Sequence, residues 1–292
     1  KSVFPPTGPM RGFTSVTIYG LNFMVASYDF STNNTFCRFQ VSKPQDSNLA
    51  WTWSTAYFLS DTSLRCTTPP TTVPVSHEIG ITFNGQNFHV QQGVKFSYFA
   101  LDRVDPPFGG VLGNTVLKVS GKFLETMEVE SERAQYMCKF SQDNQTIIKV
   151  ASFQKPSNVI CTAPAMRFGP AHLSIALHGN AFSEDPLIFQ YVAEAFVNHS
   201  VPNTGPRTGG YRVVVTGQRF LNSTLLSCRF KLEPGLDVVR EAQYLSPTTA
   251  SCIAPETTLS GMARIYILNN GQQDSSTFAE FTYFTVVDVL PD

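Results

Sequence analysis

The sequence contains little charge and no excess of either sign. Only 15% of its 292 residues are charged, and 21 Lys and Arg stand against 22 Asp and Glu. Proteins that bind nucleic acids need a surplus of Lys and Arg to neutralise phosphates. The balance therefore argues against a nucleic-acid partner. It predicts a surface whose polarity comes from Ser, Thr, Asn and Gln.

The sequence also lacks a long apolar run. No stretch reaches the about 18 apolar residues of a membrane-spanning helix, and the N-terminal KSVFPPTGP has no signal-peptide core. We therefore expect no direct insertion into a membrane. A mature secreted chain, or a fragment of a larger ectodomain, would show the same absence.

Patterns typical of catalytic and metal sites are missing too. The histidines have no Ser, Cys or carboxylate partner at a repeated position, and the cysteines form no Cys-x-x-Cys zinc motif. The glycine pairs belong to turns rather than to a phosphate-binding loop. These absences predict a protein that is not an enzyme and that needs no cofactor or metal ion. The five histidines are His77, His89, His172, His178 and His199.

What the sequence has instead is a threefold repeat. In each repeat a first cysteine precedes Arg or Lys and then Phe, a second opens a Cys-x-x-Pro phrase, and Phe-x-Tyr closes the repeat. The closing residues Phe96, Phe189 and Phe281 are 93 and then 92 residues apart. We predict domains at residues 1–99, 100–192 and 193–285. Residues 286–292 would begin a further repeat or form a strand that joins subunits.

Apolar residues within each repeat alternate with a period of two, and no segment shows helical periodicity. Val16 and Ile18 lead into Gly20, for example, and the run Ile79, Ile81, Phe83 leads into Asn84-Gly85. Asn-Gly between alternating runs is a strong hairpin signal. The pattern predicts an all-β fold, with the alternating residues of each run on one face.

The cysteines indicate the redox environment. Their repeated placement predicts the disulfides Cys37–Cys66, Cys138–Cys161 and Cys228–Cys252. In the chain-entropy model, closing loops of this length stabilises each domain by roughly 3–4 kcal/mol. Buried free thiols of a cytosolic sandwich are the alternative. Recurrence in all three repeats favours oxidising, extracellular surroundings.

The order of the motifs resembles the IPT/TIG domain, an immunoglobulin-like fold shared by plexins, the hepatocyte growth factor receptor and many long surface proteins. The resemblance implies three immunoglobulin-like β-sandwiches that act as spacers or ligand surfaces and carry no catalytic motif. Such domains also occur in Rel-type transcription factors and beside carbohydrate-active enzymes. The supporting residues are the openings Pro6-Thr7-Gly8-Pro9, Pro107-Phe108-Gly109-Gly110 and Gly205-Pro206 with Gly209-Gly210, the strand-ending Gly20, Gly121 and Gly217, and the following Phe23, Phe123 and Phe220.

Four Asn-x-Ser/Thr sequons predict N-linked glycans, at Asn33, Asn144, Asn198 and Asn222. Chance occurrence is the alternative, because Asn, Ser and Thr are abundant. Together with the paired cysteines, the sequons favour a glycosylated protein that is extracellular or lies at the cell surface.

Trp51 and Trp53 stand at alternating positions in the longest cysteine loop, with Tyr57 beyond them. The functional interpretation is an exposed aromatic platform for a sugar ring or a partner protein. The alternative is packing into the core or between domains. Alternation next to Cys66 favours this inward packing.

The C-terminal segment, with Val286, Val287, Val289 and Leu290, repeats the joint between the first two repeats. The chain is therefore expected to be one period of something longer. Short joints with proline predict a stiff, rod-like array. One hypothesis is a structural unit of a cell-surface fibre, coat or stalk, in which the tail adds as a strand to the next copy in a head-to-tail homopolymer. The alternative is a ligand-binding ectodomain fragment of a receptor or adhesin, with neighbouring domains as partners.

Overall fold

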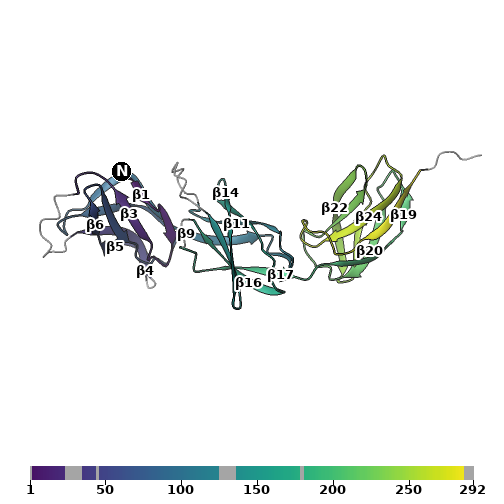
Figure 1. Ribbon diagram of the computed structural model, residues 1–292, viewed down its shortest axis with the longest axis horizontal. Helices are drawn as coiled ribbons and strands as arrows, with labels where there is room; N and C mark the ends of the chain where they lie inside the picture. The colour runs from purple at the N-terminus through teal and green to yellow at the C-terminus, as the bar shows by residue number, and fades with distance from the viewer. Residues whose placement is uncertain (1, 24–34, 44–45, 125–135, 178–180, 286–292) are drawn as a thin grey trace, which may run out of the picture. The chain divides into compact units, whose positions relative to one another are not determined.

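The computed structural model describes residues 2–23, 35–43, 46–124, 136–177 and 181–285 (Figure 1). Every regular element in this part of the chain is a β-strand, which confirms the all-β prediction. We keep the names repeat 1, repeat 2 and repeat 3 for residues 1–99, 100–192 and 193–285. These boundaries, and the rod-like array, stay predictions.

Two compact units make up the chain, and the division between them falls inside repeat 2. Unit 1 comprises Lys1–Pro107, Leu117–Thr162 and Ala171–Phe189. Unit 2 comprises Phe108–Val116, Ala163–Pro170 and Gln190–Asp292.

The strands follow the chain in three sets that correspond to the repeats. The first set is β1 (Ser2–Phe4), β2 (Thr7–Pro9), β3 (Ser15–Tyr19), β4 (Phe36–Lys43), β5 (Asp46–Thr55), β6 (Tyr57–Ser60), β7 (Ser63–Thr67), β8 (Ser76–Thr82) and β9 (His89–Asp105). The second is β10 (Phe108–Gly110), β11 (Val116–Lys122), β12 (Met137–Gln142), β13 (Gln145–Val150), β14 (Ser152–Gln154), β15 (Asn158–Thr162), β16 (Gly169–Ala176) and β17 (Leu187–Val192). The third is β18 (Phe196–Val201), β19 (Thr204–Pro206), β20 (Arg212–Gln218), β21 (Ser227–Leu232), β22 (Leu236–Ser246), β23 (Thr249–Ile253), β24 (Gly261–Leu268) and β25 (Ala279–Phe284).

In unit 1, strand β9 serves two repeats. Its first half closes repeat 1 by pairing with β8, and its second half opens repeat 2 by pairing with β11. A single sheet of order β14-β15-β11-β9-β8-β4-β5 results, while β1-β3-β7-β6 forms the facing sheet of repeat 1. The 17 residues of β9 thus connect the two repeats without a loop between them.

Unit 2 contains the sandwich of repeat 3, in which the strands follow the order β18-β20-β23-β22-β21-β24-β25-β19. Strand β22 belongs to both layers, because its first half pairs with β21 and its second half with β23. The opening strands also divide between the layers. β18 runs antiparallel to β20, and the short β19 runs parallel to β25. Repeat 1 has the same arrangement, with β1 beside β3 and β2 parallel to β9.

The predicted alternation is confirmed on the core side of the early strands. Val16, Val213 and Val215 are fully buried, and Ile18 nearly so. A glycine stands at the end of each of these strands, and the residue three positions later packs over it. A Cβ on Gly20 would clash with the ring of Phe23, and one on Gly217 would lie 2.7 Å from that of Phe220.

Repeat 2 departs from the expected register by one residue. The position over Gly121 is filled by Leu124, which is fully buried, whereas Phe123 has a positive φ of 55° and is 38% exposed. The sequence prediction aligned Phe123 with Phe23 and Phe220, and that alignment was wrong. Phe83 was also expected to face inward with Ile79, but it is 40% exposed. Strand β8 ends at Thr82, so the period of two no longer controls Phe83.

Candidate functional site

The structure joins the six cysteines as Cys37–Cys66, Cys138–Cys161 and Cys228–Cys252. All six are buried within their repeats. The first cysteine of each repeat lies on a strand of one layer (β4, β12 or β21). The second lies on a strand of the other layer (β7, β15 or β23). The disulfides therefore connect the two layers of each sandwich. Their role is structural.

Two sequence motifs that lie far apart in the chain meet in every repeat. The Tyr of each Phe-x-Tyr donates its hydroxyl to the carbonyl oxygen of the Pro in Cys-x-x-Pro. The distances are 2.7 Å for Tyr98 to Pro69, 2.9 Å for Tyr191 to Pro164 and 3.2 Å for Tyr283 to Pro255. Burial raises the pKa of all three tyrosines well above its ordinary value. Each hydroxyl therefore stays protonated and remains a donor.

A glycine that lies shortly after the opening motif in repeats 1 and 2, and within it in repeat 3, packs against the peptide that follows each of these prolines. Gly12, Gly113 and Gly209 all have positive φ, and a Cβ on any of them would lie within 2.6 Å of the peptide that follows the proline. Only glycine allows the opening loop to approach so closely. Packing thus explains why glycine stands at these three positions.

The outer surface of repeat 1 is the strongest binding candidate. Trp51, Trp53 and Tyr57 are 45%, 54% and 54% exposed. The favoured inward packing of the tryptophans was therefore wrong. Register gives the reason, because Trp53 pairs with Arg38 and residues directly opposite each other share a face. Cys37 and Phe39 on either side of Arg38 point into the core.

Arg38 lies between two rings on this surface. Its guanidinium carbon is 4.4 Å from the centroid of Trp51 and 4.8 Å from that of Phe88. Trp53 packs against Phe88, with ring centroids 5.4 Å apart. We call Arg38, Trp51, Trp53 and Phe88 the Arg38 surface. The combination of a cation with exposed indole rings is typical of protein-binding hot spots.

His77 lies under the Arg38 surface, on the core side. It is 5% exposed and stacks on Tyr98 at a centroid distance of 6.0 Å. Neither ring nitrogen has a hydrogen-bond partner among the described residues. Burial lowers the pKa of His77 to about 4, so its ring is neutral at physiological pH. Nothing in the sequence pattern distinguished this histidine from the exposed ones.

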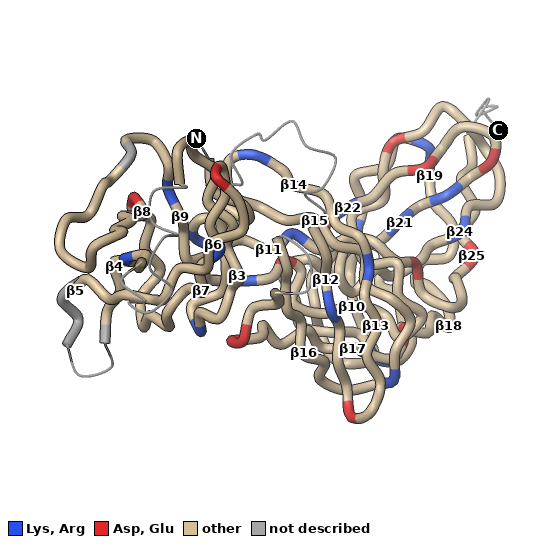
Figure 2. Tube along the Cα trace, turned by 60° about the vertical axis from the view of Figure 1, so that its left-hand side comes forward, with Lys and Arg blue, Asp and Glu red and all other residues tan. Residues whose placement is uncertain are grey.

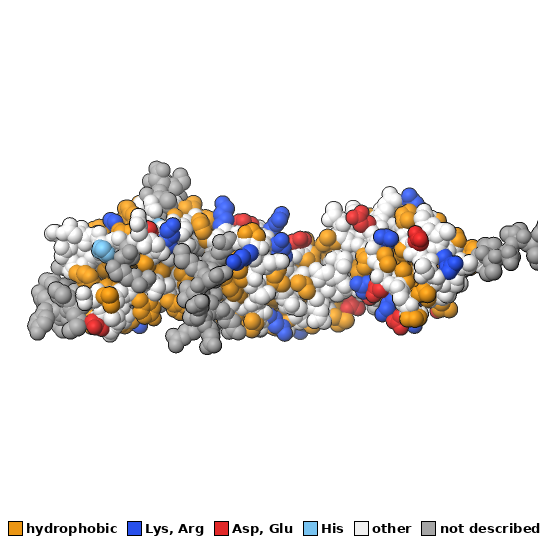
Figure 3. Space-filling model, turned by 90° about the horizontal axis from the view of Figure 1, so that it is seen from above, with side chains coloured by type: hydrophobic (Ala, Val, Ile, Leu, Met, Phe, Trp, Pro, Cys, Tyr) orange, Lys and Arg blue, Asp and Glu red, His pale blue; other side chains and the backbone are white. Residues whose placement is uncertain are grey.

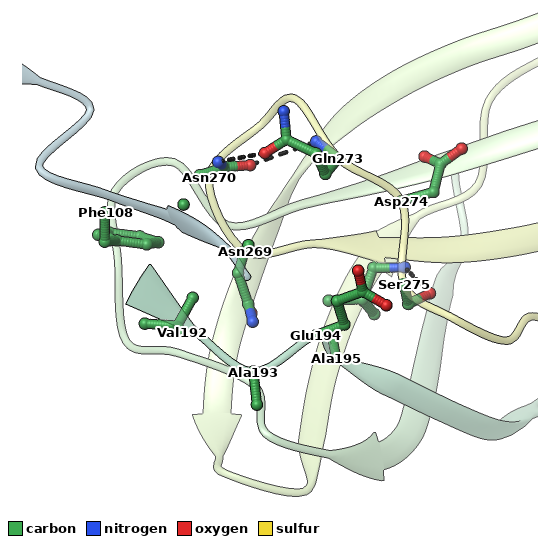
Figure 4. Close-up of a pocket in the computed structure, with 13 residues that line it drawn as sticks. Phe108, Val192, Ala193, Glu194, Ala195, Asn269, Asn270, Gln273, Asp274 and Ser275 are labelled. Carbon is green, nitrogen blue, oxygen red and sulfur yellow. Dashed lines mark hydrogen bonds between the residues drawn. The ribbon is translucent and has the colours of Figure 1, made fainter. Parts of the chain in front are cut away.

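A second candidate lies in unit 2, where the turn after β24 is hydrogen-bonded to Thr115 and Val116. Figure 4 shows the residues that line the small cavity beside this turn. Gln272 accepts a hydrogen bond from the Val116 amide at 2.8 Å and donates one to the Val116 carbonyl at 2.9 Å. Gln273 accepts from the Thr115 hydroxyl at 2.9 Å and from the Asn270 amide at 2.6 Å. The cavity beside this network measures only about 20 Å3, which is room for one water. The site is a joint between repeats rather than a ligand pocket.

An apolar hollow of about 170 Å3 lies in repeat 1. Ile18, Phe23, Ile79 and Phe83 contribute to its lining, and its polar side chains are Tyr19, Asn22 and His89. So few polar groups give little means to orient a polar ligand. We assign no ligand to it.

Three of the predicted glycosylation positions are exposed: Asn144 in the turn before β13, Asn198 on β18 and Asn222 before β21. Asn33 lies outside the described residues, as do the tail residues Val286, Val287, Val289 and Leu290. Occupancy of the sequons and a joining role for the tail stay predictions.

Charge and surface composition agree with the sequence. Acidic and basic residues are interspersed along the strands (Figure 2), and hydrophobic side chains lie in small groups among polar ones (Figure 3). The described residues contain no group of three or more His, Cys, Asp or Glu that could hold a metal ion. They also contain no helix long and apolar enough to cross a membrane.

The family model of the IPT/TIG domain matches residues 1–98 and 195–283, which is more than half of the sequence. The chain belongs to the IPT/TIG family. Its fold is therefore that of tandem immunoglobulin-like sandwiches, and repeat 2 shows the same disulfide and the same Tyr–Pro contact as the two matched repeats.

Plexins are among the similar proteins. Plexin-A3 of Rattus norvegicus is 24% identical over 267 residues, which are 87% of this chain and 13% of the relative. Plexin-2 of Caenorhabditis briggsae is 28% identical over 53% of this chain and 8% of the relative. A solved structure of the full extracellular region of Plexin A4 matches 96% of this chain and 24% of that one, at 16% identity and a TM-score of 0.49. The chain thus spans a small part of its relatives. With its disulfides, the likeness to plexins marks it as extracellular or cell-surface.

Proposed function

We propose that this chain is part of the ectodomain of a plexin-like cell-surface receptor, in which the repeats hold neighbouring domains and present a surface to a protein ligand. The observation that carries the proposal is the likeness to Plexin-A3 over 87% of the chain. The buried disulfide of each repeat suits the same oxidising location.

The structural-fibre hypothesis is the weaker of the two predictions. It depends on the tail residues as a joining strand, and these lie outside the described residues. The plexin relatives favour a modular ectodomain with neighbouring domains as partners. Head-to-tail self-assembly stays a prediction that sedimentation of the purified chain would check.

Surface labelling of the full-length protein tests the proposal. Intact cells that produce it with an epitope tag would be treated with a membrane-impermeant biotin reagent, followed by an alkaline wash of their membranes. We expect the tagged protein to be biotinylated on intact cells and to stay with the membrane fraction after the wash. Complete release into the medium, or labelling only after permeabilisation, would overturn a receptor role.

A further inference from the structure

We propose that the Arg38 surface binds a carboxylate, supplied by an Asp or Glu side chain of an extracellular protein partner. The proposal deepens the proposed function and rests on it only in that the partner is extracellular. Arg38 would be the anchoring cation, and Trp51, Trp53 and Phe88 would contact the apolar residues that flank the partner's carboxylate.

The surroundings of Arg38 leave only one part of its guanidinium group available. Trp51 and Phe88 stand 4.4 and 4.8 Å from the guanidinium carbon. Strand β8 lies beneath the side chain, where a Cβ on Gly80 would come within 2.6 Å of Nε. Glycine at position 80 thus lets Arg38 lie flat across the sheet. The N–H groups at the edge of the guanidinium plane remain, and they are the groups that bind a carboxylate in bidentate fashion.

These donors lack an internal acceptor. The buried Nε has no hydrogen-bond partner, and Arg38 forms no ion pair within the part of the chain that the structure describes. Arg38 is half-buried, so its remaining donors face the solvent. An external carboxylate would bind these solvent-facing Nη donors and supply the counter-charge that Arg38 lacks, while Nε stays buried.

In repeat 3 the arginine at the same position has internal counter-charges, although its Nε, like that of Arg38, has no hydrogen-bond partner. Arg229 follows Cys228 as Arg38 follows Cys37. Its Nη1 lies 2.8 and 2.9 Å from the two carboxylate oxygens of Asp274, and its Nε lies 3.4 Å from Asp237. The arginine of repeat 3 therefore has two internal carboxylates.

Repeat 1 places rings where repeat 3 has these carboxylates. Asp237 pairs with the residue two positions after Arg229, and Trp51 pairs with the residue two positions after Arg38. Asp274 stands three residues after the glycine of an Asn-Gly turn, and so does Phe88. Exchanging both acids for aromatic rings keeps the arginine in place and removes its counter-charges. A carboxylate from a partner can then pair with Arg38 in place of the missing internal acids.

Within its described part, repeat 2 has neither the internal acids of repeat 3 nor the arginine of repeat 1. Its cation at the same position is Lys139, whose Nζ is 4.7 Å from the ring centroid of Phe182. The compact lysine ammonium lacks the planar fork that matches a carboxylate. Only repeat 1 combines the guanidinium, two rings and no internal acid among the described residues.

The exposed rim favours a protein partner over a sugar acid. Trp51 and Trp53 are 45% and 54% exposed, and Trp53 pairs directly with Arg38. Two large rings beside one charge match the apolar and acidic side chains of a protein segment, because aromatic residues and arginine are the side chains enriched at protein–protein interfaces. Strand β5 also ends its sheet, so the surface is open on that side.

Arginine side-chain NMR of the complete 292-residue chain, labelled with 15N-arginine, tests the proposal. The probe is the peptide acetyl-Leu-Glu-Leu-amide, compared with acetyl-Leu-Gln-Leu-amide. We expect a saturable shift of the Arg38 Nε–H signal with the glutamate peptide, at concentrations up to about 10 mM. The glutamine peptide should cause no such shift. Arg229, which already has its carboxylates, is the internal control and should not move.

Two variants complete the design. Arg38→Gln assigns the signal, and Phe88→Asp places in repeat 1 the acid that repeat 3 has at this position. We expect Phe88→Asp to weaken the glutamate peptide about tenfold, because the new carboxylate competes for Arg38. Phe88→Leu is the matched control that removes the ring without adding a charge, and it should weaken the glutamate peptide less than Phe88→Asp does.

The proposal is overturned if the glutamate peptide gives no saturable shift, or if the glutamine peptide shifts Arg38 equally. Binding of glucuronate that is tighter than that of the peptide would make this a glycan site and would also overturn it. Each result is distinct from the outcome of surface labelling, which reports only where the full-length protein resides.

Discussion

Repeats 1 and 3 have an equivalent disulfide, the same Tyr–Pro contact and matching strands, except that β22 spans both layers where repeat 1 has β5 and β6, yet they differ at three equivalent positions. Repeat 3 surrounds Arg229 with two acids, and repeat 1 surrounds Arg38 with two rings. Opposite the closing Phe, repeat 3 has the small Ala263, and repeat 1 has His77. Repeat 3 therefore supplies its arginine with internal counter-charges, whereas repeat 1, in its described part, leaves a cation without one and a neutral histidine in its core. The fold tolerates both, and the difference is the basis on which we propose repeat 1 as the repeat that binds a partner.

The largest expected effect comes from removing the closing Phe of either repeat. Phe96→Ala and Phe281→Ala should each destabilise their repeat by about 3–5 kcal/mol, because both rings are fully buried. Hydrogen exchange should show that the two variants destabilise different numbers of repeats. Phe96 lies on β9, so its loss should also speed exchange in β11 of repeat 2. Loss of Phe281 should act on repeat 3 alone. Unchanged exchange in β11 would show that the shared strand does not couple the repeats.

Acid should distinguish the two repeats next. The pKa of His77 is lowered from 6.5 to about 4 in the folded state, so the unfolded chain binds its proton first as pH falls. The stabilisation is complete above pH 6.5 and is lost between pH 6.5 and 4, by about 3 kcal/mol in all. Hydrogen exchange of β8 at pH 7 and at pH 4.5 would measure it, with β24 as reference.

His77→Ala provides the control for this pH dependence, because it gives repeat 1 the residue that repeat 3 has. The variant should lose the additional acid sensitivity of β8, whatever its stability at neutral pH. Equal acid sensitivity in the parent and the variant would assign the effect to other groups.

A smaller effect is expected at the Tyr–Pro contact. Tyr98→Phe and Tyr283→Phe each remove one hydroxyl and leave a proline carbonyl without its donor, which should destabilise the repeat by about 1 kcal/mol. The loss should be larger for Tyr98, whose hydrogen bond is 2.7 Å against 3.2 Å for Tyr283. Denaturant titration of both variants beside the parent measures this, and a larger loss at Tyr283 would contradict it.

The smallest effect is expected at Asp274. Its side chain and that of Arg229 are 34% and 26% exposed, so Asp274→Ala should lower stability by less than about 1 kcal/mol. The same variant should leave part of the Arg229 guanidinium group without an acceptor. The side-chain NMR signal of Arg229 should then begin to respond to the glutamate peptide. If the Arg229 signal does not respond, peptide binding requires the rings of repeat 1 as well as an arginine without an internal carboxylate.

Much of the fold could be predicted from the sequence because its strongest signals are local. Alternation identified the core faces of the early strands, and repetition identified the cysteine pairs. The meeting of Tyr98 with Pro69 could not be foreseen, because the two motifs lie on different strands and only the tertiary fold brings them together.

The candidate site was harder to predict because it depends on register. Alternation shows that Trp51 and Trp53 share a face, but it does not show which face. Only the pairing of Trp53 with Arg38 decides that they point outward. The shift from Phe123 to Leu124 has a similar cause, since both residues are apolar and a one-residue change reverses which of them is buried. His77 was indistinguishable in sequence from an exposed histidine.

Strand β9 has a mechanical consequence. One backbone is hydrogen-bonded to β8 and β2 at one end and to β11 at the other. Tension applied along the chain therefore passes from repeat 1 to repeat 2 through a continuous strand, and it loads both ladders in shear, with many hydrogen bonds resisting together. A receptor built in this way would convey a pull across that junction with little slack.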